Sequence, residues 1–332
     1  MIKKILIAVV CLAPLAIPFL IATSDEFPSW AYPVDPAPQP QGAPGPGGPK
    51  PPPRPAEFKD DGSLVHVPGS DAGYTRTQIR DAVPDWHPED HPAMPDIVGK
   101  GRDKVRACAY CHQPNGAGRP ESTSLAGLPE GYIKQEVGNF KMGLRKGSAP
   151  KRALQNQMNE IAANVSDADL AEAAAYFSSL KLGSYLKVVE AEMAPKTFVT
   201  GGMLAAEPEG EMEPIGKRII EVPDDLERAL ARDSHVSFTA YVPKGSIDKG
   251  RTLVTTGGGK TTACATCHGA DLHGQGDVPH IAGRSPSYVI RQLYDIQHNT
   301  RTGSVTFMQQ VVANLGMDDM INIAAYIASR EP

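Results

Sequence analysis

The chain has 332 residues, enough for more than one compact domain, and it is rich in glycine (32) and proline (31). Its 33 lysines and arginines against 38 aspartates and glutamates give a mild net charge of -5, which argues against nucleic acid as a partner. Of the five cysteines, Cys11 lies in an apolar N-terminal stretch and the other four form two Cys-x-x-Cys pairs. None is left for a structural disulfide, so the redox compartment of the protein has to be inferred from its N-terminal targeting sequence.

The N-terminus has the pattern of an export signal. Lys3 and Lys4 precede an apolar run at residues 5–22. The run is long for the apolar part of a cleaved signal and just long enough to span a bilayer. Residues 1–22 are therefore either a signal peptide or a retained membrane anchor. In both cases we expect the protein in the periplasm, with contact to the inner membrane through residues 5–22 if they are retained.

Two further segments precede the repetitive part of the chain. Residues 23–57 are proline-rich and are expected to form an extended linker that cannot bury a core. Residues 58–96 form an N-terminal extension whose internal structure the sequence does not reveal. It contains His66, His87 and His91, which we expect to be surface or capping residues and not a metal site.

The remainder of the chain contains an internal duplication. Cys264 follows Cys108 by 156 residues, and the same offset pairs Tyr132 with Tyr288. After an insertion of six residues near 148–157 the offset falls to 150. Because the match runs in the same order through both units, we assign two domains at 97–183 and 248–332, joined by a connector at 184–247.

Each unit has a helical pattern. Apolar residues recur at three- and four-residue spacing in 129–143 and 285–299. Ser166 with Asp169 predicts a capped helix start, and a matching helix is expected at 317–329. The connector contains irregularly alternating β-branched residues and several prolines, which indicates short strands. The predicted fold class is all-α: two tandem domains joined by an irregular connector with short strands.

Two Cys-x-x-Cys-His motifs supply the chemistry. In this pattern the two thiols bond to the vinyl groups of a c-type haem, and the histidine binds the iron. A thioredoxin-type redox pair or half of a zinc site shares the Cys-x-x-Cys spacing, but two copies inside a matched repeat favour two covalently bound haem c groups. The residues of the two motifs are Cys108, Cys111, His112, Cys264, Cys267 and His268.

Two methionines are candidates for the sixth iron ligand. Met158 and Met308 occupy equivalent places just before the last helix of their units. A single methionine is more often core filler, but equivalence across the repeat favours ligation. Met142 is a rival in the first unit, although the matching residue of the second unit is His298. A thioether ligand closes the iron to substrate and raises its potential, which suits electron transfer.

With these features together, the two units resemble class I cytochrome c domains in tandem, similar to the dihaem cytochrome c4 group. The shared features are the haem motif, a glycine-rich loop after it, and Leu/Ile-Ala-Gly before a tyrosine-bearing helix. A methionine ahead of a closing helix with Ala-Ala-Tyr completes them. The resemblance covers about half of the chain and implies an all-α fold around each haem and a periplasmic electron-carrier role.

The resemblance also implies a partner for each proximal histidine. In such domains a proline carbonyl commonly accepts from the other ring nitrogen and fixes the imidazole. Pro279 fits that position in the second unit, whereas Thr123 stands there in the first and leaves the partner of His112 open. His273 and His280 flank the second haem loop and are expected at the surface.

We therefore expect an electron-transfer protein and not an enzyme. Its partners would be redox proteins of the periplasm or membrane, such as a dehydrogenase, a quinol-oxidising complex or a terminal oxidase. A free carrier and an electron-transfer subunit of a larger oxidoreductase both remain open. The alternative is a dihaem enzyme: a cytochrome c peroxidase, which needs an open iron beside acid–base groups, or a thiosulfate-oxidising cytochrome, which needs a free cysteine.

Overall fold

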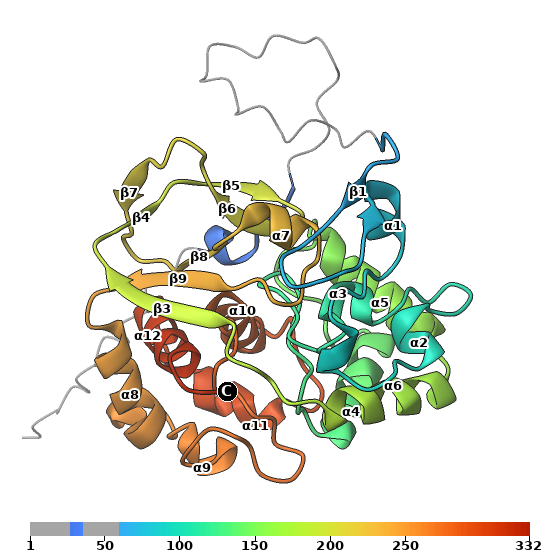
Figure 1. Cartoon of the computed structure of the whole chain (residues 1–332). Helices are drawn as coiled ribbons and strands as arrows, with labels where there is room; N and C mark the ends of the chain where they lie inside the picture. The colour runs from blue at the N-terminus through green and yellow to red at the C-terminus, as the bar shows by residue number, and fades with distance from the viewer. Residues whose placement is uncertain (1–26, 36–59) are drawn as a thin grey trace, which may run out of the picture.

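A computed structural model describes residues 27–35 and 60–332 (Figure 1). The apolar segment at 1–22 and most of the linker at 23–57 lie outside the described residues. Among the residues that are described, no helix is both long and apolar enough to cross a membrane. The described chain is mostly helical, and most of its strands belong to the segment that connects the two repeated units in sequence (Figure 1).

The first repeated unit consists of short helices around one core. They are α2 (Asp96–Gly99), α3 (Ala109–His112), α4 (Glu130–Lys141), α5 (Ala153–Asn164) and α6 (Asp167–Ser179). Ile133 of α4 and Phe177 of α6 are buried in this core. The Ser166 hydroxyl accepts from the Asp169 backbone N–H at 3.1 Å, which confirms the predicted start of α6.

The second repeated unit follows the same plan. Its helices are α8 (Ser246–Thr256), η3 (Gly257–Gly259), α9 (Ala265–His268), α10 (Pro286–Gln297), α11 (Thr306–Val312) and α12 (Met317–Ala328). Helices α8 and α12 cross at Gly250, where a Cβ atom would lie 1.9 Å from the backbone oxygen of Asn322. Only glycine allows this approach. The helix predicted at 317–329 is confirmed as α12.

The connector contains a folded sheet, so its predicted irregularity is wrong although its short strands are confirmed. Strands β3 (Leu186–Ala191), β9 (Phe238–Pro243) and β8 (Ile220–Pro223) pair in that order, β3 parallel and β8 antiparallel to β9. Residues of β9 alternate between buried and half-buried positions, as in a strand with one face on a core. Prolines 195, 214, 223 and 243 end strands instead of interrupting them.

Two smaller strand pairs and one helix complete the connector. β4 (Met193–Pro195) pairs with β7 (Met212–Pro214), and β5 (Thr197–Thr200) pairs with β6 (Met203–Ala206), both antiparallel. Helix α7 (Leu226–Leu230) follows β8, and the side chain of the preceding Asp225 caps its start.

The extension before the first unit is folded against the connector. It contains the strands β1 (Leu64–Val65) and β2 (Tyr74–Thr75) and the helices α1 (Arg76–Asp81) and η2 (Pro88–Asp90). Trp86 is buried, and its indole N–H donates to the backbone oxygen of Ala231 at 2.9 Å. Figure 1 shows β1 and α1 beside α7.

The start of the predicted linker is folded as well, which corrects the prediction that residues 23–57 bury no core. Residues Ser29–Ala31 form the short helix η1, and Ala31 and Tyr32 are buried against α10. The Arg291 guanidinium donates to the Ala31 carbonyl at 2.9 Å. The high proline content of the whole segment concealed these few anchoring side chains.

Candidate functional site

Both Cys-x-x-Cys-His motifs form a single helical turn at the wall of a cavity. Cys108, Cys111 and His112 line one cavity, and Cys264, Cys267 and His268 line another. The four cysteines that the structure describes are all free thiols. Their side chains therefore remain available for thioether bonds to a haem in each cavity.

Each motif histidine is fixed by a backbone carbonyl. His112 Nδ1 donates to the Thr123 oxygen and His268 Nδ1 to the Pro279 oxygen, both at 2.8 Å. The partner of His112, which the resemblance left open, is therefore the backbone oxygen of Thr123. The hydrogen bond needs only a carbonyl, which threonine supplies as well as proline does. Burial lowers the pKa of both imidazoles and favours the neutral form. Their Nε2 atoms are left to bind a metal, as in known histidine–metal sites.

The methionines sort clearly by location. Met158 of α5 lines the first cavity, and Met308 of α11 lines the second. The rival Met142 ends α4 with 66% of its surface exposed and lines neither of these two cavities. His298 donates from Nδ1 to the Tyr294 carbonyl at 3.0 Å and is likewise absent from both linings.

The two cavities share one wall. Residues from both repeated units contribute to this wall, so the wall lies at the interface between the two domains. The residues that line both cavities are Thr123, Leu128, Tyr132, Glu136, Tyr288 and Gln292. Sequence reasoning left the relation between the two centres undetermined, and the structure places them on either side of this wall.

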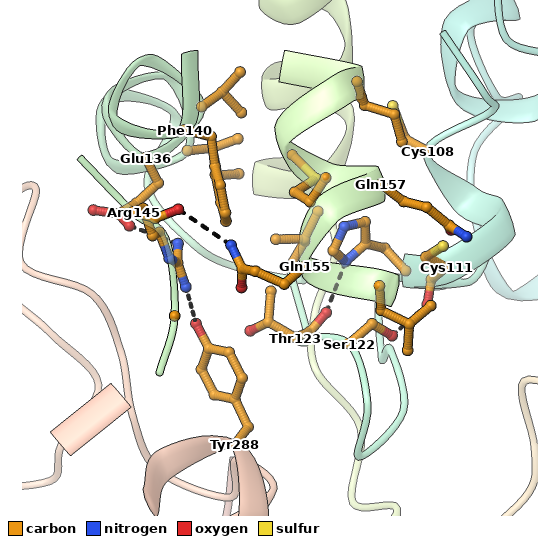
Figure 2. A pocket seen from close by; sticks show the side chains of 18 of the residues that line it. Cys108, Cys111, Ser122, Thr123, Glu136, Phe140, Arg145, Gln155, Gln157 and Tyr288 are labelled. Carbon is orange, nitrogen blue, oxygen red and sulfur yellow. Dashed lines mark hydrogen bonds and ion pairs between the residues drawn. The ribbon is translucent and has the colours of Figure 1, made fainter. Parts of the chain in front are cut away.

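A buried network of arginines crosses the interface. Arg145 donates to Glu136 at 2.6 Å, to the Tyr288 hydroxyl at 3.0 Å and to Gln292 at 2.9 Å. Figure 2 shows Arg145 between Glu136 and Tyr288.

Arg301 makes the reciprocal contacts from the second unit. It donates to Glu136 at 2.9 Å, to the Tyr132 hydroxyl at 3.1 Å and to Gln292 at 3.0 Å. Burial alone would raise the pKa of Glu136, but the two guanidiniums outweigh it and hold that pKa below its ordinary value.

The network has a two-fold pattern that the sequence already contained. The offset of 156 residues pairs Glu136 with Gln292 and Arg145 with Arg301, as it pairs the two tyrosines. The backbone follows the same symmetry, since Lys146 N–H donates to the Thr300 carbonyl and Thr302 N–H to the Leu144 carbonyl. Sequence reasoning missed these polar residues, although extending the repeat comparison to them would have found them.

The folded N-terminal segment also reaches the first cavity. The Tyr32 hydroxyl donates to Asp295 at 2.6 Å, and both residues line that cavity. Arg291, which holds Ala31, donates with its other amino group to the Pro120 carbonyl at 2.6 Å. A segment that precedes the first unit in sequence thus joins helix α10 of the second unit to the wall of the first cavity.

The remaining histidines differ in part from expectation. His66 and His273 are exposed, as predicted, whereas His87 is buried and His280 lines the second cavity. The His91 ring is also largely covered and contacts Asp85 at 3.1 Å. Their partners come from distant segments or from local folding that the sequence does not reveal.

Comparison with known proteins finds two family models that match this chain. The sequence model of cytochrome c matches residues 99–181, and that of cbb3-type cytochrome c oxidase subunit III matches residues 247–327. Cytochrome c-554(548) of Halomonas halodenitrificans is 36% identical over 80 residues, which cover 24% of this chain and 90% of the relative. The chain belongs to the cytochrome c family.

Two other relatives also match the chain. Cytochrome c4 of Pseudomonas aeruginosa is 28% identical over 232 residues, covering 68% of this chain and 85% of the relative. A thiosulfate dehydrogenase electron acceptor of Stutzerimonas stutzeri is 36% identical over 80 residues, covering 23% of this chain and 36% of the relative.

The cytochrome is a dihaem electron-transfer protein. Its two cysteine pairs, each in its own cytochrome c domain, carry two covalently bound haem c groups. The described residues fit this cofactor: each cavity joins a cysteine pair, an oriented neutral imidazole and a thioether within one largely apolar lining.

Proposed function

We propose that each haem iron is held by a histidine and a methionine, His112 with Met158 and His268 with Met308. Cys108 and Cys111 would attach the first haem, and Cys264 and Cys267 the second. Each histidine is anchored through Nδ1, which leaves Nε2 for the iron, and each methionine lines the cavity of its histidine. Closed six-coordinate iron suits electron transfer, because the coordination sphere changes little between the oxidised and reduced states.

The shared wall supports an electron relay through both haems. Tyr132, Glu136, Tyr288 and Gln292 border the two cavities at once, so an electron that enters one domain has the other centre across a single layer of side chains. The protein would accept an electron at one haem, pass it internally and deliver it from the other. This shared wall is the observation that carries the proposal.

The partners would be redox enzymes or respiratory complexes outside the cytoplasm. The name of the Stutzerimonas stutzeri relative, an electron acceptor of thiosulfate dehydrogenase, supports a dehydrogenase as one such partner. The lysines and apolar run at the N-terminus support export to the periplasm, with a tether to the inner membrane if residues 5–22 are retained. A free carrier and a subunit of an oxidoreductase use the same chemistry.

Ligand variants test the haem assignment. Met158→Ala and Met308→Ala should each abolish the ferric methionine–iron charge-transfer band of one haem and lower that haem's potential in a potentiometric titration. Met142→Ala, at the exposed rival position, should change neither the band nor the potential. A high-spin, open haem in the unmodified protein would contradict the relay and favour a peroxidase. Co-purification from solubilised membranes separates a subunit from a free carrier.

A further inference from the structure

A histidine–carboxylate cluster lies where the extension meets the connector, outside the haem cavities. His87 precedes η2 of the extension, while Asp233 and His235 lie between α7 and β9. One possible metal-ligating atom from each of the three residues lies within 4.8 Å of those from the other two. His87 is 1% exposed and Asp233 is fully buried, so this is not a set of solvated surface charges.

Asp233 holds the cluster together. One of its carboxylate oxygens lies 3.0 Å from His87 Nε2 and accepts the backbone N–H of His235 at 2.9 Å. The other oxygen accepts Arg228 Nε at 2.6 Å. The His235 ring stacks on the His87 ring with centroids 3.6 Å apart, and its Nε2 lies 2.5 Å from Asp90.

One ring nitrogen of this cluster has no hydrogen-bond partner. His87 Nδ1 is buried, and the nearest carboxylate oxygen, on Glu89, is 3.6 Å away. If the neutral ring donates through Nε2 to Asp233, the lone pair of Nδ1 faces the negative charge of Glu89. Buried polar atoms usually have a partner, and a bound species that changes the tautomer of this ring would supply one.

A metal ion on Nε2 would resolve this conflict. An ion on Nε2 requires the neutral tautomer whose single proton is on Nδ1, and Nδ1 then donates toward Glu89. Metal-bound histidines usually pair with a carboxylate in this way. The 3.0 Å between His87 Nε2 and the Asp233 oxygen also approaches the ~3.3 Å between two ligands of one tetrahedral ion with bonds of about 2.0–2.2 Å.

The charge of the cluster favours a divalent ion. Three carboxylates, on Asp233, Asp90 and Glu89, lie beside the two imidazoles, and the Arg228 guanidinium contacts Asp233. With neutral histidines these groups carry two excess negative charges. Nitrogen ligands combined with a carboxylate suit Zn²⁺, Cu²⁺ or Ni²⁺ better than Mg²⁺ or Ca²⁺.

We propose that His87, Asp233 and His235 bind a divalent transition-metal ion of the zinc type. The His235 side chain is partly exposed and contacts Asp90, so its ring is free to turn from Asp90 toward the ion on binding. Arg228 remains hydrogen-bonded to the second carboxylate oxygen of Asp233 and orients the carboxylate. The ion would link the extension, through His87, to the connector, through Asp233 and His235.

The connector residues of this metal site also contact the loop that follows the first haem motif. Gln113, next to His112, donates to the Asp233 carbonyl at 3.4 Å, and Asn115 donates to the Ser234 carbonyl at 3.2 Å. Metal occupancy therefore stabilises the contact between the connector and the first haem domain.

Zinc titration of the intact dihaem protein tests the site. After chelator treatment and removal of the chelator, calorimetry with ZnCl₂ at pH 7.5 should give one saturable site, and elemental analysis should give one zinc per two haem irons. Binding should weaken at pH 5, because histidine ligands must be deprotonated. Zinc should also raise the thermal unfolding midpoint.

Two single-histidine variants separate the site from adventitious binding. His235→Ala removes a partly exposed ligand and should lower zinc affinity at least about tenfold. His66→Ala removes an exposed histidine of the same extension and should leave affinity unchanged. Equal affinity in His235→Ala and the unmodified protein would overturn the proposal. So would stability that responds to pH and not to zinc, since the cluster would then bind only protons.

Discussion

Arg145 and Arg301 cross the domain interface in opposite directions, and each donates to the tyrosine of the other domain, Tyr288 and Tyr132 respectively. The two arginines are related by the sequence repeat, so duplication of one domain produced an interface with approximate two-fold symmetry. The symmetry is broken where Glu136 corresponds to Gln292, which leaves one carboxylate between two guanidiniums.

Removing one of these arginines should lower the free energy of unfolding of the protein. Arg145→Leu deletes the contacts to Glu136, Tyr288 and Gln292 and leaves buried polar atoms short of partners. We expect a loss of about 1–3 kcal/mol in the free energy of unfolding, measured by urea denaturation. Lys134→Ala, which removes an exposed ion pair with Glu130 on the same helix, should change it by less than about 0.5 kcal/mol. Equal effects would contradict a structural role for the network.

The carbonyl bond to His112 should tolerate a change of side chain. Thr123→Ala and Thr123→Pro both keep the backbone oxygen that accepts from Nδ1. We expect the first haem to retain its low-spin spectrum and its potential in both variants. A loss of low-spin signal in Thr123→Ala would mean that the hydroxyl, and not the carbonyl, positions the imidazole.

The folded N-terminal segment should contribute measurably to stability. Tyr32→Phe removes the hydroxyl bonded to Asp295 and should cost about 0.5–1.5 kcal/mol, whereas Tyr32→Ala also removes the buried ring and should cost about 3–5 kcal/mol. Phe27→Ala, at a ring that is 39% exposed, should cost less than Tyr32→Ala. Urea unfolding measures all three. If residues 27–35 were only a spacer, none of the three variants would change the free energy of unfolding.

His280 should make the stability of the second domain depend on pH. Arg284 donates to its Nδ1, and its Nε2 contacts the Ala282 carbonyl, an arrangement that satisfies the neutral ring. Burial, reinforced by the Arg284 charge, lowers the pKa of His280 to about 4, whereas an unfolded histidine has a pKa of about 6.5. The unfolded chain binds the proton more readily than the folded one. The contribution of neutral His280 to the free energy of unfolding is therefore fully present above pH ~6.5 and is lost as the pH falls toward 4.

Unfolding midpoints between pH 7 and pH 4.5 measure this dependence. His280→Gln should flatten the curve in that window, whereas His273→Gln, at an exposed neighbour, should leave its slope unchanged. Identical slopes in the His280 variant and the unmodified protein would contradict the assignment.

The local haem chemistry was predictable because it depends on short spacing. The Cys-x-x-Cys-His motifs indicated covalent haem, and the repeat separated Met158 and Met308 from the other methionines. The helix that begins after Ser166 was predictable for a similar reason, since capping and periodicity act within a few residues.

The connector shows where local patterns fail. β3 pairs with β9, about fifty residues later, and no local pattern announces a parallel partner so distant in sequence. The prolines of the connector suggested irregularity, yet four of the five end strands and the fifth, Pro208, lies in a turn.

By itself, then, the sequence determined the cofactor, its attachment and the duplicated helical plan, because each depends on residues close in the chain or repeated at a constant offset. Only the tertiary structure decided that both cavities share a wall, that Tyr32 reaches the first of them, and that His87 meets Asp233 and His235. Those contacts join segments up to 263 residues apart, as in the bond from Tyr32 to Asp295, and depend on how whole units pack together.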